Sequence, residues 1–352
     1  MTDLTKMLVK STTKIMKDIC TKEFIDEAER GRWAAELWEV LSEAGMLTVA
    51  VPEELDGTGG TFAEAYEILR LAGKYAAPIP LAETYMGNWI MADLGLAATC
   101  EPLAILANEG EPFQFKKEGA GWSVTGKARS VPWGRHARLL LVLGETETGS
   151  VLALMSPTEA KVTTGQNLAG EPRDTMVLEA APVADEHLFA VDARQVHSRL
   201  LSTGALCRSV MMAGALERIA ELTVKYTTER SQFGRPLHRF QAIQHHLASL
   251  AGETAAANTA ASYAVAASRR GPDEKAIAMA KIRINEAAGI VAPVAHQVHG
   301  AIGFTHEHVL HQCTRRVLAW RDEWGTETQW AEKLAEQLML LEENGLWPYL
   351  SE

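Results

Sequence analysis

The chain has 352 residues, of which 47% are hydrophobic and 22% are charged, and its formal net charge at pH 7 is −11. This composition is typical of a globular protein with enough chain for two or three domains, and the negative charge argues against nucleic acid or an anionic membrane as a partner. The longest aliphatic run, Leu139 to Leu143, is far shorter than the roughly 20 residues that span a bilayer, and the N-terminus has no signal-peptide pattern. We therefore expect a cytoplasmic protein.

Three regions with different patterns follow one another along the chain. Residues 1–105 carry apolar side chains at the three- and four-residue spacing of amphipathic helices. Residues 106–195 change to short apolar segments, such as Arg138 to Leu143, which are separated by turn residues and indicate strands. Residues 196–352 return to long helical patterns, and the alanines between Ala248 and Ala267 permit close helix contacts as in a bundle. The sequence thus predicts an α+β protein with a helical N-terminal domain, a small middle β domain and a helical C-terminal domain.

The cysteines and histidines do not indicate disulfide or metal chemistry. The four cysteines are scattered without metal-ligand spacing and are expected to be free thiols: Cys20, Cys100, Cys207 and Cys313. His308 and His311 lie three residues apart, but no carboxylate or cysteine at a usual spacing completes a tetrahedral set. We expect neither a disulfide nor a metal site.

A short connection between two long helical patterns has the residue types of a dinucleotide site. It reads Arg230-Ser231-Gln232-Phe233-Gly234-Arg235-Pro236-Leu237 and is followed by Gln241. A guanidinium at a helix end can bind a diphosphate, while the ring of Phe233 offers a stacking face for a base and Gln241 can bond the polar edge of that base. The alternative is purely structural, with the arginine capping a carbonyl and Phe233 filling a helix junction.

A second segment, from Gln297 to Glu307, ends a helix in a pair of glycines, Gly300 and Gly303, where backbone can approach a ligand closely. The pairing of these two segments resembles the C-terminal domain of the acyl-CoA dehydrogenase family, flavoproteins that desaturate acyl-CoA thioesters. Val51-Pro52-Glu53-Glu54 and Ala76 to Thr84 look like parts of the first helical domain of that family.

The resemblance implies the acyl-CoA dehydrogenase fold, in which a middle β-barrel-like domain lies between an N-terminal helical domain and a C-terminal four-helix bundle. It implies FAD as cofactor, acyl-CoA as substrate and electron-transfer flavoprotein as electron acceptor. It also implies an oligomer, because these segments contact FAD that is bound mainly to a neighbouring subunit. The cofactor residues carried over are Arg230, Gln232, Phe233, Gln241, Gln297, Gly300, Gly303 and Thr326. Trp133 is the aromatic residue best placed to cover the flavin ring, or else it only fills the sheet.

Desaturation needs a base for the α proton, and both usual positions of this base lack a carboxylate. In the family a glutamate most often precedes a Gly-Thr pair, but Gly325-Thr326 is preceded by Trp324. In some relatives the glutamate lies on an earlier helix, at a position that corresponds to Gly204. Glu323 is adjacent to the first position, although a shift of one residue turns a helical side chain by about 100°. Its alternative role is that of a solvated acidic cap.

Three interpretations follow from the missing carboxylate. Glu323 is the base of a rearranged dehydrogenase, or the base comes from a different polypeptide, or the chain is a non-catalytic flavin-binding partner or a flavin monooxygenase, which needs no such base. Short members of the family that act on steroid-derived or other bulky acyl-CoA thioesters are commonly built from two unlike subunits. This chain resembles them in its length and in its Arg230–Pro236 segment, and we favour a subunit of such a heteromeric dehydrogenase.

Overall fold

The computed structural model describes residues 3–108, 110–341 and 345–351. The chain divides into two compact units, Met1–Gly204 and Ala205–Glu352, and the boundary falls within the long helix α6 (Ala193–Glu229). The expected α+β class is confirmed, since helices come first, strands follow and helices return. The finer division into three domains at residues 105 and 195 stays a prediction.

The described part of the first unit begins with a set of helices, of which the last is apolar and buried. They are α1 (Asp3–Ile19), α2 (Lys22–Glu29), α3 (Ala35–Glu43), α4 (Phe62–Lys74) and α5 (Leu81–Asp93). Residues 81–91 of α5 are buried on all sides, so its polar side chains need partners inside the protein. Tyr85, Asn88 and Trp89 find these partners by donating hydrogen bonds to the backbone carbonyls of Met46, Leu47 and Val49.

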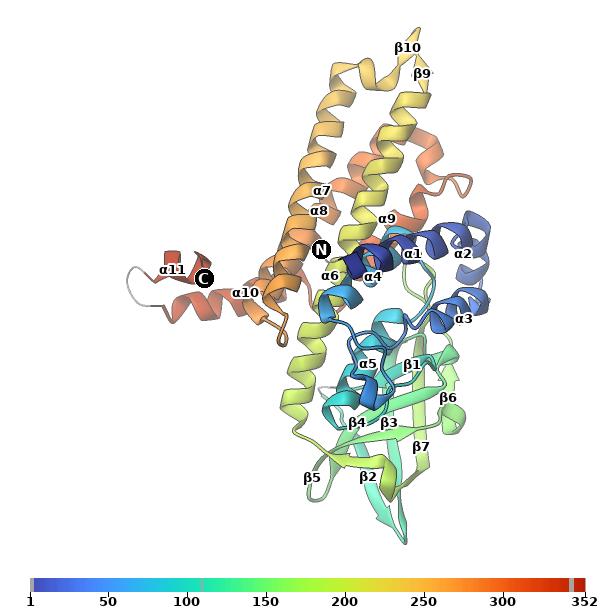
Figure 1. Cartoon of the computed structure of the whole chain (residues 1–352), viewed down its shortest axis with the longest axis vertical. Coiled ribbons are helices and arrows are strands. Elements are labelled where there is room, and N and C mark those ends of the chain that lie inside the picture. The colour runs from blue at the N-terminus through green and yellow to red at the C-terminus, as the bar shows by residue number, and fades with distance from the viewer. Residues whose placement is uncertain (1–2, 109, 342–344, 352) are drawn as a thin grey trace. The chain divides into compact units, whose positions relative to one another are not determined.

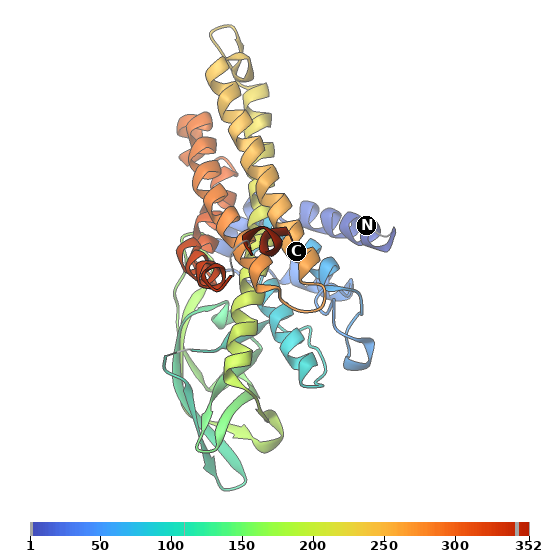
Figure 2. The same ribbon diagram turned by 90° about the vertical axis from the view of Figure 1, so that its left-hand side faces the viewer.

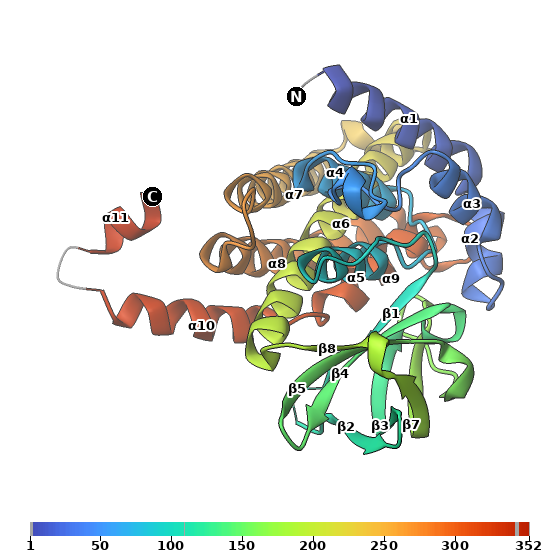
Figure 3. The same ribbon diagram turned by 60° about the horizontal axis from the view of Figure 1, so that its bottom comes forward.

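The described strands of the first unit form one mixed sheet in the order β6-β7-β3-β2-β4-β5-β8, with β1 paired to β4 (Figure 3). Their bounds are β1 (Leu103–Leu106), β2 (Phe113–Glu118), β3 (Gly121–Pro132), β4 (Leu139–Thr146), β5 (Gly149–Met155), β6 (Ala160–Thr163), β7 (Arg173–Ala184) and β8 (Leu188–Ala190). Alternate residues point into a core around Phe113, which is fully buried. A Cβ on Gly126 would lie 2.3 Å from the ring of Phe113, so only glycine leaves room for this ring.

The second unit contains the rest of α6 and a set of further helices. These are α7 (Gln241–Ala267), α8 (Glu274–His299), α9 (Leu310–Arg321), α10 (Glu327–Met339) and α11 (Leu346–Ser351). A two-stranded hairpin, β9 (Ser231–Gln232) and β10 (Arg235–Pro236), joins α6 to α7. Helices α7 and α8 run side by side (Figures 1 and 2), and buried alanines such as Ala257, Ala261 and Ala280 allow them to pack closely.

The four cysteines are free, and Cys207 and Cys313 are buried. Among the residues that the structure describes, none of the helices combines the length and the apolar character that a membrane span requires.

Candidate functional site

The tip of the β9–β10 hairpin presents an aromatic ring to solvent. Its two central residues, Phe233 and Gly234, have φ angles of 50° and 79°, as a type I′ turn requires. This left-handed conformation costs a residue with a side chain on the order of 1–3 kcal/mol of free energy. Phe233 adopts it nevertheless, and the residue is 93% exposed. Its ring meets the ring of Phe240 edge-on at 6.2 Å, and the guanidinium of Arg235 lies 4.1 Å from the centre of the Phe240 ring. The hairpin therefore holds a large ring ready for contact with a ligand or a partner.

The predicted cofactor residues around the hairpin are accessible. Arg230 immediately follows α6, where its carbonyl accepts a hydrogen bond of 2.9 Å from the backbone N–H of Leu237. Arg230, Gln232 and Gln241 are all exposed, and Phe233, at 93% exposure, does not fill a helix junction in this chain. The cofactor contacts of these residues stay a prediction.

Different physical reasons explain why a glycine stands at each of the two predicted positions at the end of α8. Gly300 has a φ of 64°, and a Cβ built on it would meet nothing within 4 Å, so its backbone is open to close approach. Gly303 is buried, and a Cβ there would lie 2.9 Å from the Cβ of His299. Packing alone therefore accounts for Gly303, while Gly300 and the exposed Gln297 are available to a ligand.

One contact joins the helix that precedes the first segment to the helix end within the second segment, although the two segments are about sixty residues apart in the sequence. Tyr226, one helical turn before Arg230, donates a hydrogen bond of 3.2 Å to the carbonyl of His299, and their rings stack at 4.5 Å. Burial lowers the pKa of His299 to about 4, so this ring is neutral at pH 7. In the sequence, Ala215, Ile219, Leu222 and Tyr226 recur at a spacing of three and four residues, and this pattern places Tyr226 only on the apolar face of its helix. The sequence signal that connects Tyr226 with the candidate site is its position four residues before Arg230, because side chains at this spacing lie on the same helical face.

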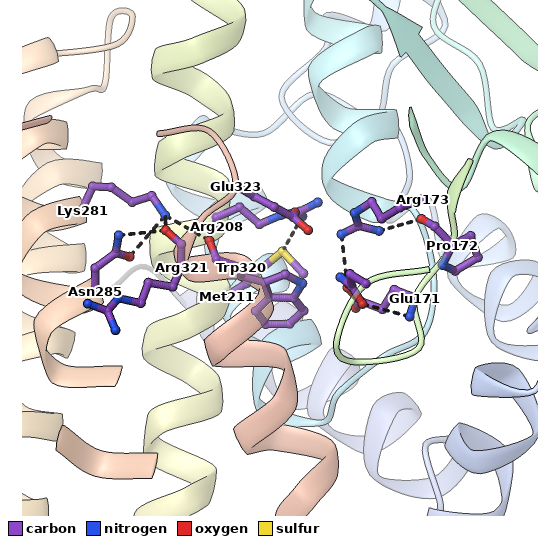
Figure 4. A network of polar contacts seen from close by, with 11 residues as sticks. Glu171, Pro172, Arg173, Arg208, Met211, Lys281, Asn285, Trp320, Arg321 and Glu323 are labelled. Atoms are coloured by element: carbon purple, nitrogen blue, oxygen red, sulfur yellow. Dashed lines mark hydrogen bonds and ion pairs between the residues drawn. The ribbon is translucent and has the colours of Figure 1, made fainter. Parts of the chain in front are cut away.

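The turn from Asp322 to Thr326 holds the candidate base (Figure 4). The carboxylate of Glu323 accepts a hydrogen bond of 2.7 Å from Nε of Arg208, which is 2% exposed and lies 5.9 Å from the centre of the Trp320 ring. Glu323 is therefore held in an ion pair, and taking a proton from a substrate would require it to share or break this pair. Its assignment as the base stays a prediction.

The residues that follow Glu323 are fixed by local geometry. Trp324 and Gly325 have φ angles of 57° and 96°. A Cβ on Gly325 would lie 2.6 Å from Nε1 of Trp330, and this nitrogen donates to the carbonyl of Trp324 at 2.9 Å. Thr326 caps α10 through a capping box with Gln329. A helix cap thus accounts for the Thr326 hydroxyl, and a contact of this residue with the cofactor stays a prediction.

Trp133 lies at the end of β3, in the first unit. It has a φ of 57°, is 5% exposed, and donates its backbone N–H to the carbonyl of Pro172 at 3.1 Å. Its ring is tilted against that of His136 at 6.1 Å. This burial fits a ring that fills the sheet, and its role over a flavin stays a prediction.

A buried carboxylate fixes the turn that follows Trp133. Asp174 is fully buried and accepts hydrogen bonds from the backbone N–H groups of Arg135 and Gly165 and from the Arg135 guanidinium. Burial alone would raise the pKa of Asp174, but these hydrogen bonds hold it below its ordinary value. In the same loop region, Arg173 donates to the carboxylate of Glu171 at 3.2 Å (Figure 4).

The histidines near the end of α8 act as hydrogen-bond partners. Nδ1 of His308 accepts from the backbone N–H of Leu310 at 3.1 Å, and Nδ1 of His311 lies 3.1 Å from a guanidinium nitrogen of Arg315. In the described part of the chain, no group of three or more His, Cys, Asp or Glu side chains is arranged to hold a metal ion.

Comparisons with known proteins agree with the arrangement of this chain. The family model of the acyl-CoA dehydrogenase N-terminal domain matches residues 2–100, and that of the acyl-CoA dehydrogenase C-terminal domain matches residues 194–339. The acyl-CoA dehydrogenase IpdE2 of Mycolicibacterium smegmatis is 29% identical over 283 residues, which cover 80% of this chain and 81% of that protein.

Two solved structures share the fold. A chain of the ChsE4–ChsE5 complex from Mycobacterium tuberculosis superposes with a TM-score of 0.83 at 24% identity, covering 97% of this chain and 99% of that one. A chain of the Tcur3481–Tcur3483 steroid ACAD superposes with a TM-score of 0.82 at 24% identity, covering 96% and 98% of the two chains.

Proposed function

Because the chain belongs to the acyl-CoA dehydrogenase family, we propose that it helps to bind FAD and takes part in the α,β-desaturation of an acyl-CoA thioester. The contact of Tyr226 with His299 carries this proposal, since it joins the last turn of α6, which leads into the Arg230 segment, to the end of α8, which leads into the Gly300 turn. The chemistry of both segments fits a dinucleotide. Arg230 would bind the diphosphate, Phe233 would stack on a base, and the open backbone at Gly300 would allow close approach.

The protein must supply a base for the α proton, whereas bound FAD would supply the acceptor for the β hydride. Neither Trp324 nor Gly204 can take a proton, and Glu323 is held by Arg208. The two family positions thus offer no free carboxylate in this chain. This supports the assignment that a carboxylate of a second, unlike subunit removes the proton, and electron-transfer flavoprotein is the proposed final electron acceptor.

A heteromeric enzyme for bulky or steroid-derived acyl-CoA is the form that we favour. Two proteins of the same fold are a ChsE4–ChsE5 complex and a steroid ACAD named for two chains. The second unit also exposes large apolar side chains, as a subunit interface would require: Phe233, Phe304, Met339, Leu340, Leu346 and Trp347. The alternative is a structural or flavin-binding partner without its own reaction, or a monooxygenase, and the missing base is the observation that favours it.

The visible absorption spectrum tests this proposal directly. We expect the chain purified alone to lack a full complement of flavin, and to acquire the absorption band of oxidised flavin when it is co-expressed with its partner subunit. Bleaching of that band by an acyl-CoA would then report desaturation. A colourless complex would contradict the proposal, and a fully yellow chain that is bleached without a partner would show a self-sufficient dehydrogenase.

Replacing Glu323 with glutamine distinguishes the two possible sources of the base. We expect turnover of the complex to stay within about threefold of wild type, because the base lies in the partner. General-base catalysis contributes roughly 100-fold or more, so a loss of that size would instead identify Glu323 as the base. The Asp322→Asn variant is the matched control, since Asp322 is a neighbouring acid of the same turn and its side chain is exposed.

A further inference from the structure

A buried lysine caps the helix that leads into the turn at residues 322–326. Lys281 lies on α8 and is 0% exposed. Its Nζ is surrounded by three oxygen acceptors, the carbonyls of Trp320 and Arg321, each at 3.0 Å, and Oδ1 of Asn285 at 3.2 Å (Figure 4). The two carbonyls belong to the last turn of α9, where carbonyl groups lack partners within the helix. A cation at this end also interacts favourably with the helix dipole.

Asn285, one helical turn further along α8, forms hydrogen bonds at both ends of the turn at residues 322–326. Its side-chain amide donates to the carbonyl of Arg321 at 2.9 Å and to the carboxylate of Glu327 at 3.2 Å. Glu327 lies in the first turn of α10 and forms an ion pair with the guanidinium of Arg321. Both ends of the turn at residues 322–326 are therefore bonded to side chains of α8, and Glu323 within it is bonded to Arg208 of α6.

This arrangement needs a donor that an apolar side chain cannot replace. Replacing a buried ion by a well-packed apolar residue is often neutral for stability, so burial by itself does not require a lysine here. An ammonium group has three N–H bonds and can donate to all three acceptors at once, which no apolar side chain can do. The carbonyls of Trp320 and Arg321 also accept from the backbone N–H of Glu323 and from the Asn285 amide. Burial lowers the pKa of Lys281 to about 7, with the charge of Glu323 acting in the opposite direction. The neutral amine has only two N–H bonds and must release one of the three acceptors.

We propose that Lys281 is a positioning residue that fixes the turn at residues 322–326 and thereby sets the orientation of Glu323 and Trp324. This inference rests on the proposed function in one respect, namely that the turn occupies the family position of the base. The charged groups that face Lys281 come from every element around it: Arg208 on α6, Arg321 on α9, Asp322 and Glu323 in the turn, and Glu327 on α10. On α7, Glu253 is already paired with Arg283.

The test follows the indole of Trp324 by ¹⁹F NMR in protein labelled with 5-fluorotryptophan, with the resonance assigned through Trp324→Phe. In wild type we expect this resonance to move with a midpoint near pH 7, as Lys281 loses a proton and one hydrogen bond. In Lys281→Met the transition disappears, and in Lys281→Arg, which stays charged, it is also absent. Lys275→Met is the matched control on the same helix and should behave as wild type, because Lys275 bonds the carbonyl of Tyr349 instead of the turn.

A Trp324 resonance in Lys281→Met that follows the wild-type curve at every pH would overturn the proposal. The collapse of all tryptophan resonances would show that Lys281→Met does not fold. In that case Lys281→Arg tests the proposal, because a wild-type pH transition in that variant would exclude Lys281 as the source of the transition. None of these readouts requires flavin or turnover. A chain that is not a dehydrogenase can therefore still confirm the positioning role, and a dehydrogenase can still fail this test.

Discussion

Replacing Arg230 with alanine is expected to lower the affinity for FAD by about 10- to 100-fold, and hence the flavin retained through purification. A hydrogen bond between charged groups contributes roughly 1.5–3 kcal/mol, which corresponds to this range. The Arg230 side chain is exposed, so its replacement would remove the proposed diphosphate contact without disturbing a core. The measurement is the ratio of flavin to protein absorbance in the purified complex, together with titration of the apoprotein with FAD.

Arg239→Ala is the matched control for this variant. Arg239 is another exposed arginine, in the short helix between the hairpin and α7, and we expect its replacement to leave the flavin content unchanged. Wild-type flavin content in Arg230→Ala would exclude the proposed diphosphate contact. An equal loss in both variants would indicate a general effect of positive charge instead of a defined site.

Replacing Asp174 with asparagine should lower the free energy of unfolding by about 3 kcal/mol at pH 7, because it breaks a buried ion pair. Asp174 accepts bonds from the backbone N–H groups of Arg135 and Gly165 and from the Arg135 guanidinium, and an amide can accept at only one atom. The turn after Trp133 depends on these bonds, so the variant should also perturb that tryptophan. Urea denaturation followed by circular dichroism measures the change.

The pH dependence of this effect has a defined sign. The pKa of Asp174 is lower in the folded protein than its ordinary value, so its contribution is fully present above that ordinary value, about 3.9, and is lost as the pH falls below it. The difference in stability between wild type and Asp174→Asn should therefore shrink in acid. Asp185→Asn is the control, because Asp185 is paired with Lys117 at the surface and its loss should change stability little. Equal stability of the Asp174 variant and wild type at pH 7 would refute this account.

The ion pair of Arg208 with Glu323 suggests how the missing base is accommodated. Arg208 lies one helical turn after Gly204, and Glu323 lies one residue before Trp324. Each partner is thus a neighbour of one of the two positions where relatives place a glutamate. The ion pair gives Glu323 a structural role, which agrees with a subunit that relies on another chain for proton abstraction.

Sequence patterns alone predict the order of helices and strands, the short connection at residues 230–237 between two long helices, and the residue types of both candidate cofactor segments. These features depend on local rules, namely apolar periodicity and the turn preference of glycine and proline, which act between residues close in the chain. For this reason the predicted strand from Arg138 to Leu143 is confirmed as β4, which begins one residue later, at Leu139, and ends at Thr146.

Which distant side chains meet depends on the packing of whole helices. Arg208 and Glu323 are separated by 115 residues, and Lys281 lies 39 residues from the carbonyl of Trp320 that it caps. Such pairs form because packing of whole helices brings one face of each against another, and no local pattern records that choice. Even the close contact between Gly303 and the His299 side chain, four residues earlier, is visible only in the structure, and the contact of Gly303 with the cofactor stays a prediction.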